Sequence, residues 1–218
     1  NPRCTAPGGS RGCTPPAVLE RTLLHSTNTY AIPNARIVAA SCRTNIPPST
    51  ALRGFGGPQA MFVMESAITR VAEALELPRD VVQARNLMCQ GDSFPYGQSL
   101  STDAIRQTWQ IAEQTYDLAG IQVRIAQYNA NHAETKRGYA LMPICFGISF
   151  TATMLNQASA LVHVYTDGSV SISTGGVEMG QGLTTKLVAL AVKAFGIRDT
   201  RIKIEPTNTT RIANMSAS

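Results

Sequence analysis

Two glycine-rich loops constrain this chain more than any other feature of its sequence. They run from Arg53 to Gln59 and from Gly175 to Gly182, and each stands directly before a segment with helical periodicity. Dense glycines let the backbone approach a ligand closely, and the start of a helix adds N–H donors that favour an anion. Neither loop has the Gly-Lys-Ser/Thr ending of a phosphate-binding loop or the three spaced glycines of a dinucleotide fingerprint. A pair of ordinary turns is the alternative, but two such loops in one chain favour a bulky anionic cofactor.

The first part of the chain, up to about residue 130, is predicted to be mainly helical. Residues 1–16 are rich in Pro, Gly, Ser and Arg without periodicity, so we expect an unstructured or non-native arm there. Apolar residues at three- and four-residue spacing follow the first glycine loop, and Pro58 suits the first turn of that helix. The expected elements are helices over residues 16–25, 59–77, 78–87 and 102–128 and a strand over residues 35–41.

The second part follows a hydrophilic linker over residues 129–136 and is predicted to form strands and one last helix. The pair Asp167-Gly168 supplies a hairpin turn, and Gly196 closes the helix. The expected strands cover residues 138–149, 158–165, 170–174 and 201–205, and the expected helix covers residues 183–195. This order indicates an α+β fold in two linked units, a helix-rich unit over residues 17–130 and a strand–hairpin–loop–helix unit over residues 131–218.

The net charge of +5 comes from the beginning of the chain. Residues 1–53 contain six arginines and one glutamate, so the rest of the sequence is neutral overall. The arginines are scattered and lack the lysines and interleaved aromatic residues of a nucleic-acid-binding surface. We therefore expect no nucleic-acid partner and interpret individual arginines as groups directed at an anionic ligand.

The cysteines and histidines form no recognisable ligand set. The five cysteines include no C-x-x-C pair, and the three histidines, His25, His132 and His163, are far apart in sequence. This pattern argues against a disulfide framework and against a zinc or iron–sulfur site within the chain, and it favours a reducing compartment, the cytoplasm. No apolar run of about 18 residues or more is present, so we expect no membrane span.

Several strings of residues resemble the molybdopterin-binding region of xanthine dehydrogenases and related molybdenum hydroxylases. Residues 50–59 are similar to the first molybdopterin loop of that family. The resemblance continues through residues 136–151, 155–158 and 163–169, and residues 175–183 complete it. It covers about Cys13 to Ser218 in order, and we expect residues 1–12 to lie outside it.

The resemblance implies an oxidoreductase whose molybdenum is held by a pterin. Members of the family hydroxylate an electron-poor ring carbon with oxygen derived from water, and their electrons leave through 2Fe-2S clusters to FAD and usually NAD. The implied cofactor here is therefore molybdenum–molybdopterin. The implied partners are iron–sulfur and FAD domains or subunits, and the implied substrate is a purine such as xanthine or hypoxanthine. The intact enzyme is expected to be a homo-oligomer.

The resemblance also implies which residues hold the cofactor. Arg53 matches the arginine that lies beside the molybdenum. Further matches to residues at the pterin and metal are Gly54, Met179, Gly180, Gln181 and Lys186. No catalytic residue is assigned within the chain, because the glutamate base of the family belongs to a motif beyond Ser218; Glu178 is not interpreted as that base.

Four residues match substrate contacts of the family. Phe55 and Phe150 match the aromatic pair that sandwiches a flat substrate, and Thr151 matches a further contact. Arg21 matches the arginine that orients a purine and stabilises the charge developing on its oxygen. Without the resemblance, Phe150 would be interpreted as a core residue, and Arg21 and Lys186 as solvated positions on their helices.

The sequence departs from the family at several points. Leu52 stands where many relatives have Phe, and Thr174 and Thr184 replace histidines of some members. The upstream substrate loop, the downstream pterin loop, the glutamate base and the iron–sulfur and FAD domains are absent from the chain. We therefore expect residues 1–218 by themselves to be catalytically inactive.

Three classes of function stay open at this point. The first is a molybdenum hydroxylase of purines, with an aldehyde oxidase or another N-heteroaromatic hydroxylase as the alternative; Arg21 favours a purine, since aldehyde-type members tend to lack it. The second is a non-catalytic assembly module that retains the glycine loops, which molybdenum analysis of the full protein would distinguish. The third is a basic nucleic-acid binder, for which a salt-dependent shift with DNA would be the test.

Overall fold

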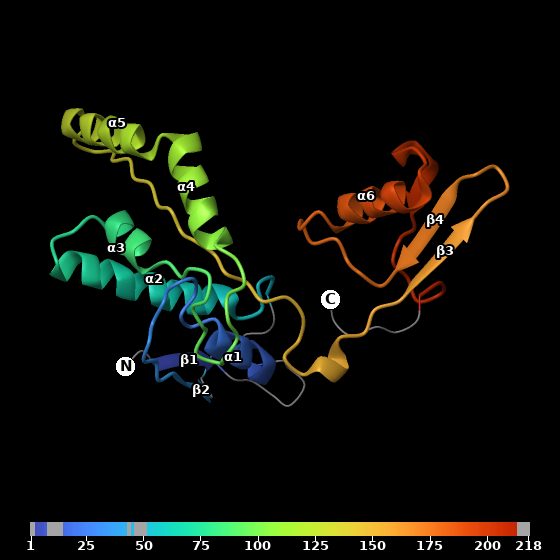
Figure 1. The fold of residues 1–218 in the computed structure, drawn as a ribbon, viewed down its shortest axis with the longest axis horizontal. Coiled ribbons are helices and arrows are strands. Elements are labelled where there is room, and N and C mark those ends of the chain that lie inside the picture. The colour runs from blue at the N-terminus through green and yellow to red at the C-terminus, as the bar shows by residue number, and fades with distance from the viewer. Residues whose placement is uncertain (1–2, 8–14, 43–44, 46–51, 213–218) are drawn as a thin grey trace. The chain divides into compact units, whose positions relative to one another are not determined.

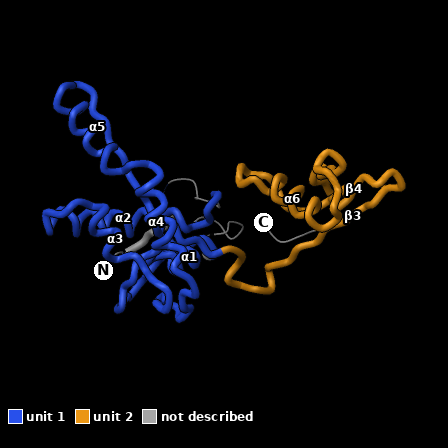
Figure 2. The backbone as a smooth tube through the Cα atoms, turned by 45° about the horizontal axis from the view of Figure 1, so that its top comes forward, with its two compact units in different colours: residues 1–147 blue, residues 148–218 orange. Residues whose placement is uncertain are grey.

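The computed structural model describes residues 3–7, 15–42, 45 and 52–212. The chain forms two compact units, unit 1 over residues 1–147 and unit 2 over residues 148–218 (Figure 2). The division falls after the linker that we expected to separate the units. The linker stays with unit 1 because the side-chain amide of Asn129 hydrogen-bonds both backbone groups of Arg137, at 2.7 and 2.9 Å.

Unit 1 is mainly helical, as the sequence predicts. The three helices predicted over residues 16–25, 59–77 and 78–87 are confirmed with small shifts at their ends. The elements are β1 (Arg3–Pro7), α1 (Pro15–Leu24), β2 (Val38–Cys42), α2 (Gly57–Ala74), α3 (Arg79–Asn86), α4 (Ala104–Tyr116) and α5 (Leu118–Asn131) (Figure 1).

The strand β1 lies in the arm that we expected to be unstructured. It pairs in parallel with β2, with Arg3 opposite Val38 and Pro7 opposite Cys42. Backbone pairing of this kind needs no periodicity of side chains, which is why the composition of the segment gave no signal for it. Residues 1–2 and 8–14 of the arm, and residues 50–51 of the first glycine-loop string, lie outside the described residues.

The core of unit 1 joins α2, α3 and α4 to the loop after α1. The apolar residues that α2 buries recur at the spacing of one helical face, including Met61, Ile68 and Ala72. The buried residues of the core cluster are Tyr30, Ile68, Ala72, Val82, Leu87 and Trp109.

The single helix predicted over residues 102–128 is wrong, because the structure has two helices there. Asp117 adopts a left-handed conformation with φ of +46°, which ends α4. Its side chain then accepts a hydrogen bond from the N–H of Gly120 at 3.2 Å and caps α5. Within these two helices Trp109 is buried, whereas Tyr116 is 65% exposed.

Unit 2 is a small α+β unit around a three-stranded sheet. The strand order is β3-β4-β5, with β3 antiparallel and β5 parallel to β4. Its core is formed by Val170 and Ile172 of β4 with Ala191 of α6, and Gly168, with φ of +78°, lies in the predicted hairpin turn. The elements are a 3-10 turn (Thr153–Leu155), β3 (Ala160–Val164), β4 (Val170–Thr174), α6 (Leu183–Phe195), a second 3-10 turn (Asp199–Arg201) and β5 (Ile202–Ile204).

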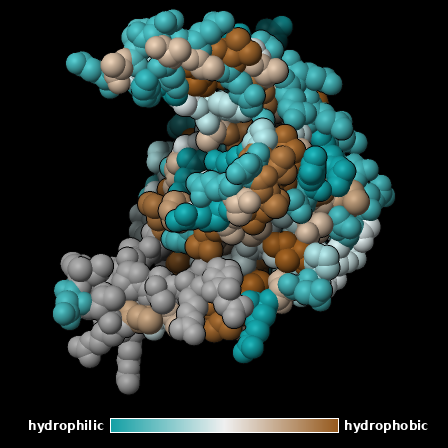
Figure 3. Space-filling model, turned by 90° about the vertical axis from the view of Figure 1, so that its left-hand side faces the viewer, coloured by the Kyte–Doolittle hydropathy of each residue, from teal (hydrophilic) through white to brown (hydrophobic). Residues whose placement is uncertain are grey.

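Large apolar side chains also lie on the surface of unit 1. Phe62 of α2 is 74% exposed, Leu75 directly after this helix is 59% exposed, and Ile111 of α4 is 60% exposed. The space-filling view shows hydrophobic residues in brown among the hydrophilic ones on one face of the molecule (Figure 3). Within the described residues, no helix has both the length and the apolar character that a membrane crossing requires.

Candidate cofactor and substrate site

The glycines of the first loop serve helix packing. Gly56 has φ of +104°, and a Cβ there would lie 2.1 Å from the carbonyl oxygen of Val18 in α1. The hydroxyl of Thr22 donates to the carbonyl of Gly56 at 3.0 Å and ties the loop to α1. A Cβ on Gly57 would lie 2.7 Å from the ring of Phe146. Our inference that these glycines exist for a ligand is therefore wrong for Gly56 and Gly57, which bring helix α2 against its neighbours.

Two side chains of the first loop remain accessible. Arg53 is exposed and Phe55 is half-buried, while Gly54 between them has φ of +96°. Phe55 itself has φ of +49°, a left-handed conformation that costs a bulky residue free energy. The N–H of Phe55 donates to the carbonyl of Leu52 at 2.8 Å and helps to hold this conformation. An aromatic residue kept in a strained loop supports a role in contact with a ligand.

Arg21 is a buried cation on α1. Its residue exposure is only 8%, so the solvated-helix interpretation of this arginine is wrong. Its Nη1 donates to the carbonyl of Gly147, and its guanidinium carbon lies 5.1 Å from the centroid of the Phe146 ring. Burial lowers the pKa of Arg21, although a guanidinium remains charged at neutral pH.

The strand predicted over residues 138–149 is wrong as a strand but correct as an extended segment. Residues 138–148 belong to no strand of the structure. Along residues 141–146, side chains are alternately half-buried and exposed, the pattern of an extended chain with one face covered. Side chains of unit 1, rather than a neighbouring strand, hold its backbone.

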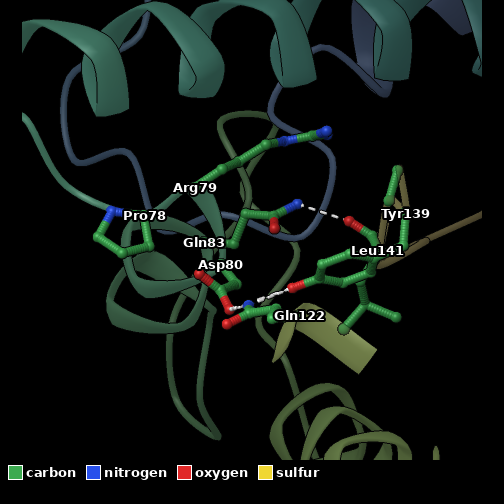
Figure 4. Close-up of a pocket in the computed structure, with 8 residues that line it drawn as sticks. Pro78, Arg79, Asp80, Gln83, Gln122, Tyr139 and Leu141 are labelled. Carbon is green, nitrogen blue, oxygen red and sulfur yellow. Dashed lines mark hydrogen bonds between the residues drawn. The ribbon is translucent and has the colours of Figure 1, made fainter. Parts of the chain in front are cut away.

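Two amide side chains hold the first half of this segment. The Nε2 of Gln83 donates to the carbonyl of Leu141 at 2.9 Å (Figure 4). Asn28 donates from Nδ2 to the carbonyl of Pro143 at 2.8 Å and accepts from the N–H of Cys145 at 3.2 Å. Every second residue thus has a backbone group paired with a side chain.

Arg21 and His25 hold the end of the segment in the same manner. The carbonyl of Gly147 accepts from Arg21, and its N–H donates to Nε2 of His25 at 2.8 Å. Because the four side chains Gln83, Asn28, His25 and Arg21 replace the partner strand that the pattern predicts, we refer to them as the side-chain ladder.

A buried carboxylate orients two members of the side-chain ladder. Glu65 of α2 is 6% exposed and accepts from the hydroxyl of Tyr30 at 2.6 Å and from Nδ2 of Asn28 at 3.3 Å. Its other oxygen accepts from Nη2 of Arg79 at 2.7 Å and from Nε2 of Gln83 at 2.9 Å. Burial, followed by the bond to Glu65, raises the pKa of Tyr30. The sequence analysis missed this cluster, and its one local signal is an acid on the apolar face of α2.

The second glycine loop satisfies its own backbone donors. Glu178 accepts from the N–H groups of Gly180 and Gly182 with Oε1, at 2.8 and 3.0 Å, and from that of Thr184 with Oε2 at 3.1 Å. Gln181 accepts from the N–H of Met179 at 2.6 Å. These backbone bonds, that from Thr184 first, lower the pKa of Glu178. Glu178 is itself an anion at the start of α6 and pairs with these three N–H groups, so the expectation that the loop binds an anionic ligand stays a prediction for its other groups.

Three predicted residues of unit 2 differ in their surroundings. Phe150 is half-buried, and its backbone N–H and carbonyl bond to the side-chain amide of Asn156 at 2.7 and 2.9 Å. Thr151 and Lys186 are exposed. Phe150 belongs to unit 2 and Phe55 to unit 1, and their pairing around a substrate stays a prediction.

A cavity of about 300 Å³ in unit 1 contains none of the predicted site residues. Asp80 accepts from Gln122 at 2.8 Å on its wall (Figure 4). The lining residues are Pro78, Arg79, Asp80, Gln83, Gln122, Tyr139, Ala140 and Leu141. The described residues contain no group of three or more His, Cys, Asp or Glu that could hold a metal ion, and Cys42, Cys89 and Cys145 are free thiols.

Comparison with known proteins agrees with the resemblance. The molybdopterin cofactor-binding domain family matches residues 3–87 with one of its domains and residues 111–218 with another. The chain is 42% identical over 200 residues to xanthine dehydrogenase 1 of Arabidopsis thaliana and 41% identical over 209 residues to the xanthine dehydrogenase/oxidase of Gallus gallus. The chain belongs to the xanthine dehydrogenase and molybdenum hydroxylase family.

The chain covers 15% of the length of each of these two relatives, while the alignments cover 92% and 96% of the chain. The first family match begins at residue 3, within the segment that we expected to lie outside the resemblance. Among solved structures, the aldehyde oxidoreductase of Desulfovibrio desulfuricans has a similar fold, with a TM-score of 0.74 over 98% of this chain and 23% of that one. At 21% identity this similarity concerns the fold alone.

The accessible residues of the second loop fit the molybdopterin of this family. Gly180 and Gly182 have φ of +88° and +76°, and a Cβ on Gly182 would meet no atom within 4 Å, so the backbone there is open. Met179 and Lys186 are exposed beside it, and Gln181 is half-buried. Because Glu178 takes the backbone donors, contacts to the cofactor would come from these three side chains.

Proposed function

We propose that these residues belong to a xanthine dehydrogenase-type enzyme that hydroxylates purines such as xanthine and hypoxanthine. The observation that carries the proposal is the burial of Arg21 between the Gly147 carbonyl and the Phe146 ring. A cation fixed in this way has its direction set before a ligand arrives, as stabilisation of a developing negative charge requires. Identity of about 40% to xanthine dehydrogenases over most of the chain supports the same substrate class.

Arg53, Met179, Gln181 and Lys186 are proposed to hold the cofactor, with the Gly54 and Gly180 backbones giving it room to approach. When bound, the molybdenum cofactor supplies the electron acceptor and activates the oxygen that is transferred. Lys186 and Arg53 are exposed cations that suit an anionic pterin. The electrons are proposed to leave through 2Fe-2S clusters to FAD and NAD on other domains or subunits.

Phe55, Phe150, Thr151 and Arg21 are proposed to bind the substrate. The two aromatic rings would stack on a flat heterocycle and exclude water, and Thr151 would hydrogen-bond its edge. Arg21 would face the oxygen or nitrogen on which negative charge builds during hydroxylation. A homo-oligomeric cytoplasmic enzyme is proposed from the resemblance and the cysteine pattern, and residues 1–218 alone are proposed to be inactive.

The test compares two arginines that each donate to a backbone carbonyl. Arg21→Met in the full-length enzyme is expected to lower kcat for xanthine by about 100- to 1,000-fold, while a small aldehyde is much less affected. Arg106 donates to the carbonyl of Leu87 at 2.7 Å, and Arg106→Met is the control for loss of such a bond. Molybdenum content is measured in every preparation.

Two other outcomes would contradict the proposed function. Equal losses of xanthine and aldehyde turnover in Arg21→Met would make Arg21 a structural residue. The proposal would then reduce to a molybdenum hydroxylase of the family without a purine assignment, with an aldehyde oxidase or another N-heteroaromatic hydroxylase as the alternatives. A full-length protein without molybdenum, purified under conditions that load a known relative, would make it a non-catalytic assembly module.

A further inference from the structure

His25 has a single possible pattern of hydrogen bonds in this structure. Its Nε2 lies 2.8 Å from the backbone nitrogen of Gly147, and its Nδ1 lies 2.9 Å from the carbonyl oxygen of Arg21. A backbone N–H can only donate and a carbonyl can only accept, so Nε2 carries no hydrogen and Nδ1 carries one. The ring is therefore neutral and in one tautomer.

The two bonds link His25 to the group that holds the Arg21 guanidinium. His25 fixes the N–H of Gly147, and Arg21 donates to the carbonyl of the same residue. Phe146 completes the arrangement, because its ring centroid lies 5.2 Å from that of His25 and 5.1 Å from the guanidinium carbon of Arg21. Arg21 and His25, which are four residues apart, thus hydrogen-bond the two backbone groups of Gly147.

We infer that His25 is a positioning residue for Arg21. By holding the N–H of Gly147, His25 fixes the carbonyl that receives the guanidinium, and it sets where that cation points. The inference rests on the proposed function, in which Arg21 meets the purine. It assigns no contact between His25 and the substrate.

Protonation of His25 would abolish its positioning of the Gly147 backbone and, through it, of the Arg21 guanidinium. A hydrogen on Nε2 would face the N–H of Gly147, and the bond between them would be lost. Burial lowers the pKa of His25, the bond to the Arg21 carbonyl raises it by less, and the charge of Arg21 adds to the lowering. Arg21 is the charged group that acts on His25, and the residues that pack on its other side, Phe146 and Gly147, have no titratable side chain.

The test uses the full-length enzyme with two variants of His25. His25→Leu removes the acceptor for the Gly147 N–H, whereas His25→Gln offers a side-chain oxygen in its place and does not titrate. His25→Leu is expected to lower kcat for xanthine about 10- to 100-fold, the range for groups that orient a functional residue, and to leave a small aldehyde within about twofold. His25→Gln is expected to recover most of the xanthine activity.

A histidine with the same local bond provides the control. The Nδ1 of His132 lies 2.8 Å from the carbonyl oxygen of Tyr128, four residues earlier, as that of His25 does from Arg21. His132→Leu is expected to leave both substrates unchanged. In the native enzyme the ratio of xanthine to aldehyde turnover should fall as the pH drops through the pKa of His25, and His25→Gln should abolish this dependence.

The outcomes separate this inference from the proposed function. Equal losses for both substrates in His25→Leu, no loss at all, or a His25→Gln variant as impaired as His25→Leu would overturn the positioning role. Arg21→Met is assayed alongside: if that variant is selective for xanthine and His25→Leu is not, the proposed function stands and the inference fails. If Arg21→Met affects both substrates equally, the proposed function itself fails.

Discussion

Nη2 of Arg79 lies 2.7 Å from Oε2 of Glu65 inside unit 1, where the Glu65 side chain is 7% exposed. The same carboxylate receives Asn28 and Gln83, whose amides hold the extended segment that begins at Leu141. The ion pair therefore stabilises more than the contact between α2 and α3. It fixes the orientation of two side chains on which the path of the chain toward Gly147 depends.

Glu65→Ala should destabilise the protein strongly. It leaves the Arg79 guanidinium, the Tyr30 hydroxyl and two amides without their common acceptor, and removal of one partner of a buried ion pair costs about 3–5 kcal/mol. Glu73→Ala is the matched control on the same helix, since Glu73 pairs with Arg70 at 3.5 Å and their side chains are 61% and 85% exposed. That variant should change the free energy of unfolding by about 1 kcal/mol or less. Urea unfolding measures both, and similar values for the two variants would contradict the prediction.

Two loop glycines should respond differently to an added methyl group. Gly182→Ala meets open space and costs only the left-handed backbone conformation, about 1–2 kcal/mol. Gly56→Ala adds to that cost a contact of 2.1 Å with the Val18 carbonyl, and it should lose more than about 4 kcal/mol or fail to fold. The measurement is the unfolding free energy of each variant. Equal effects would show that Gly56 is not needed for the packing of α1 against the loop.

The stability contributed by Glu178 should depend on pH. Backbone hydrogen bonds lower its pKa in the folded chain below its ordinary value of 4.5. The stabilisation is then fully present above that ordinary value, and it is lost as the pH falls through the lowered pKa. Glu178→Gln should lower the thermal midpoint at neutral pH, and its difference from the native chain should shrink as the pH falls through the lowered pKa of Glu178.

Amide hydrogen exchange provides a second measurement on the same variant. The N–H of Thr184 should exchange faster in Glu178→Gln, because the amide nitrogen of Gln cannot accept its hydrogen bond. Asp199→Asn is the control. Asp199 accepts a hydrogen bond from the N–H of Thr200 at 2.8 Å, and Asn keeps an oxygen that can accept it, so exchange of this N–H should change little. A pH-independent difference between Glu178→Gln and the native chain would refute the capping role.

Lys186→Met should weaken retention of the molybdenum cofactor in the full-length enzyme. Loss of one charge-assisted contact of about 1.4 kcal/mol corresponds to a tenfold weaker affinity. Lys193→Met removes an equivalent exposed charge from the same helix and should leave the molybdenum content unchanged. The readout is molybdenum per protein after gel filtration, with the thermal midpoint as a check on folding. Parallel losses in both variants would indicate a general effect of helix charge.

The ends of two elements could be predicted without error from the residues within and directly beside them. The strand over residues 170–174 and the helix over residues 183–195 coincide with β4 and α6. The helix stands between glycines that end it on both sides, Gly182 and Gly196, each with positive φ. Hydrophobic periodicity and turn chemistry act over a few residues, so the sequence carries them directly.

The extended segment before Gly147 could be predicted only in part. The alternation of its residues specifies an extended backbone, but no pattern within it specifies what receives its hydrogen bonds. Those partners, Asn28 and Gln83 among them, are far away in sequence and are brought together by the packing of α2 and α3. For the same reason the site residues came from the family resemblance, and the burial of Arg21 could not be seen from its helix.

Between Leu141 and Gly147, the side-chain ladder forms its hydrogen bonds with backbone groups of the odd-numbered residues. Successive residues of an extended chain turn their peptide groups to opposite sides. Loss or gain of one residue in this stretch would turn every later peptide group away from its amide, imidazole or guanidinium partner, whereas a change of two would keep the facing direction. The ladder bonds the backbone of every second residue and makes few demands on the side chains of the segment. Substitutions in this segment should therefore be tolerated far better than insertions or deletions of a single residue.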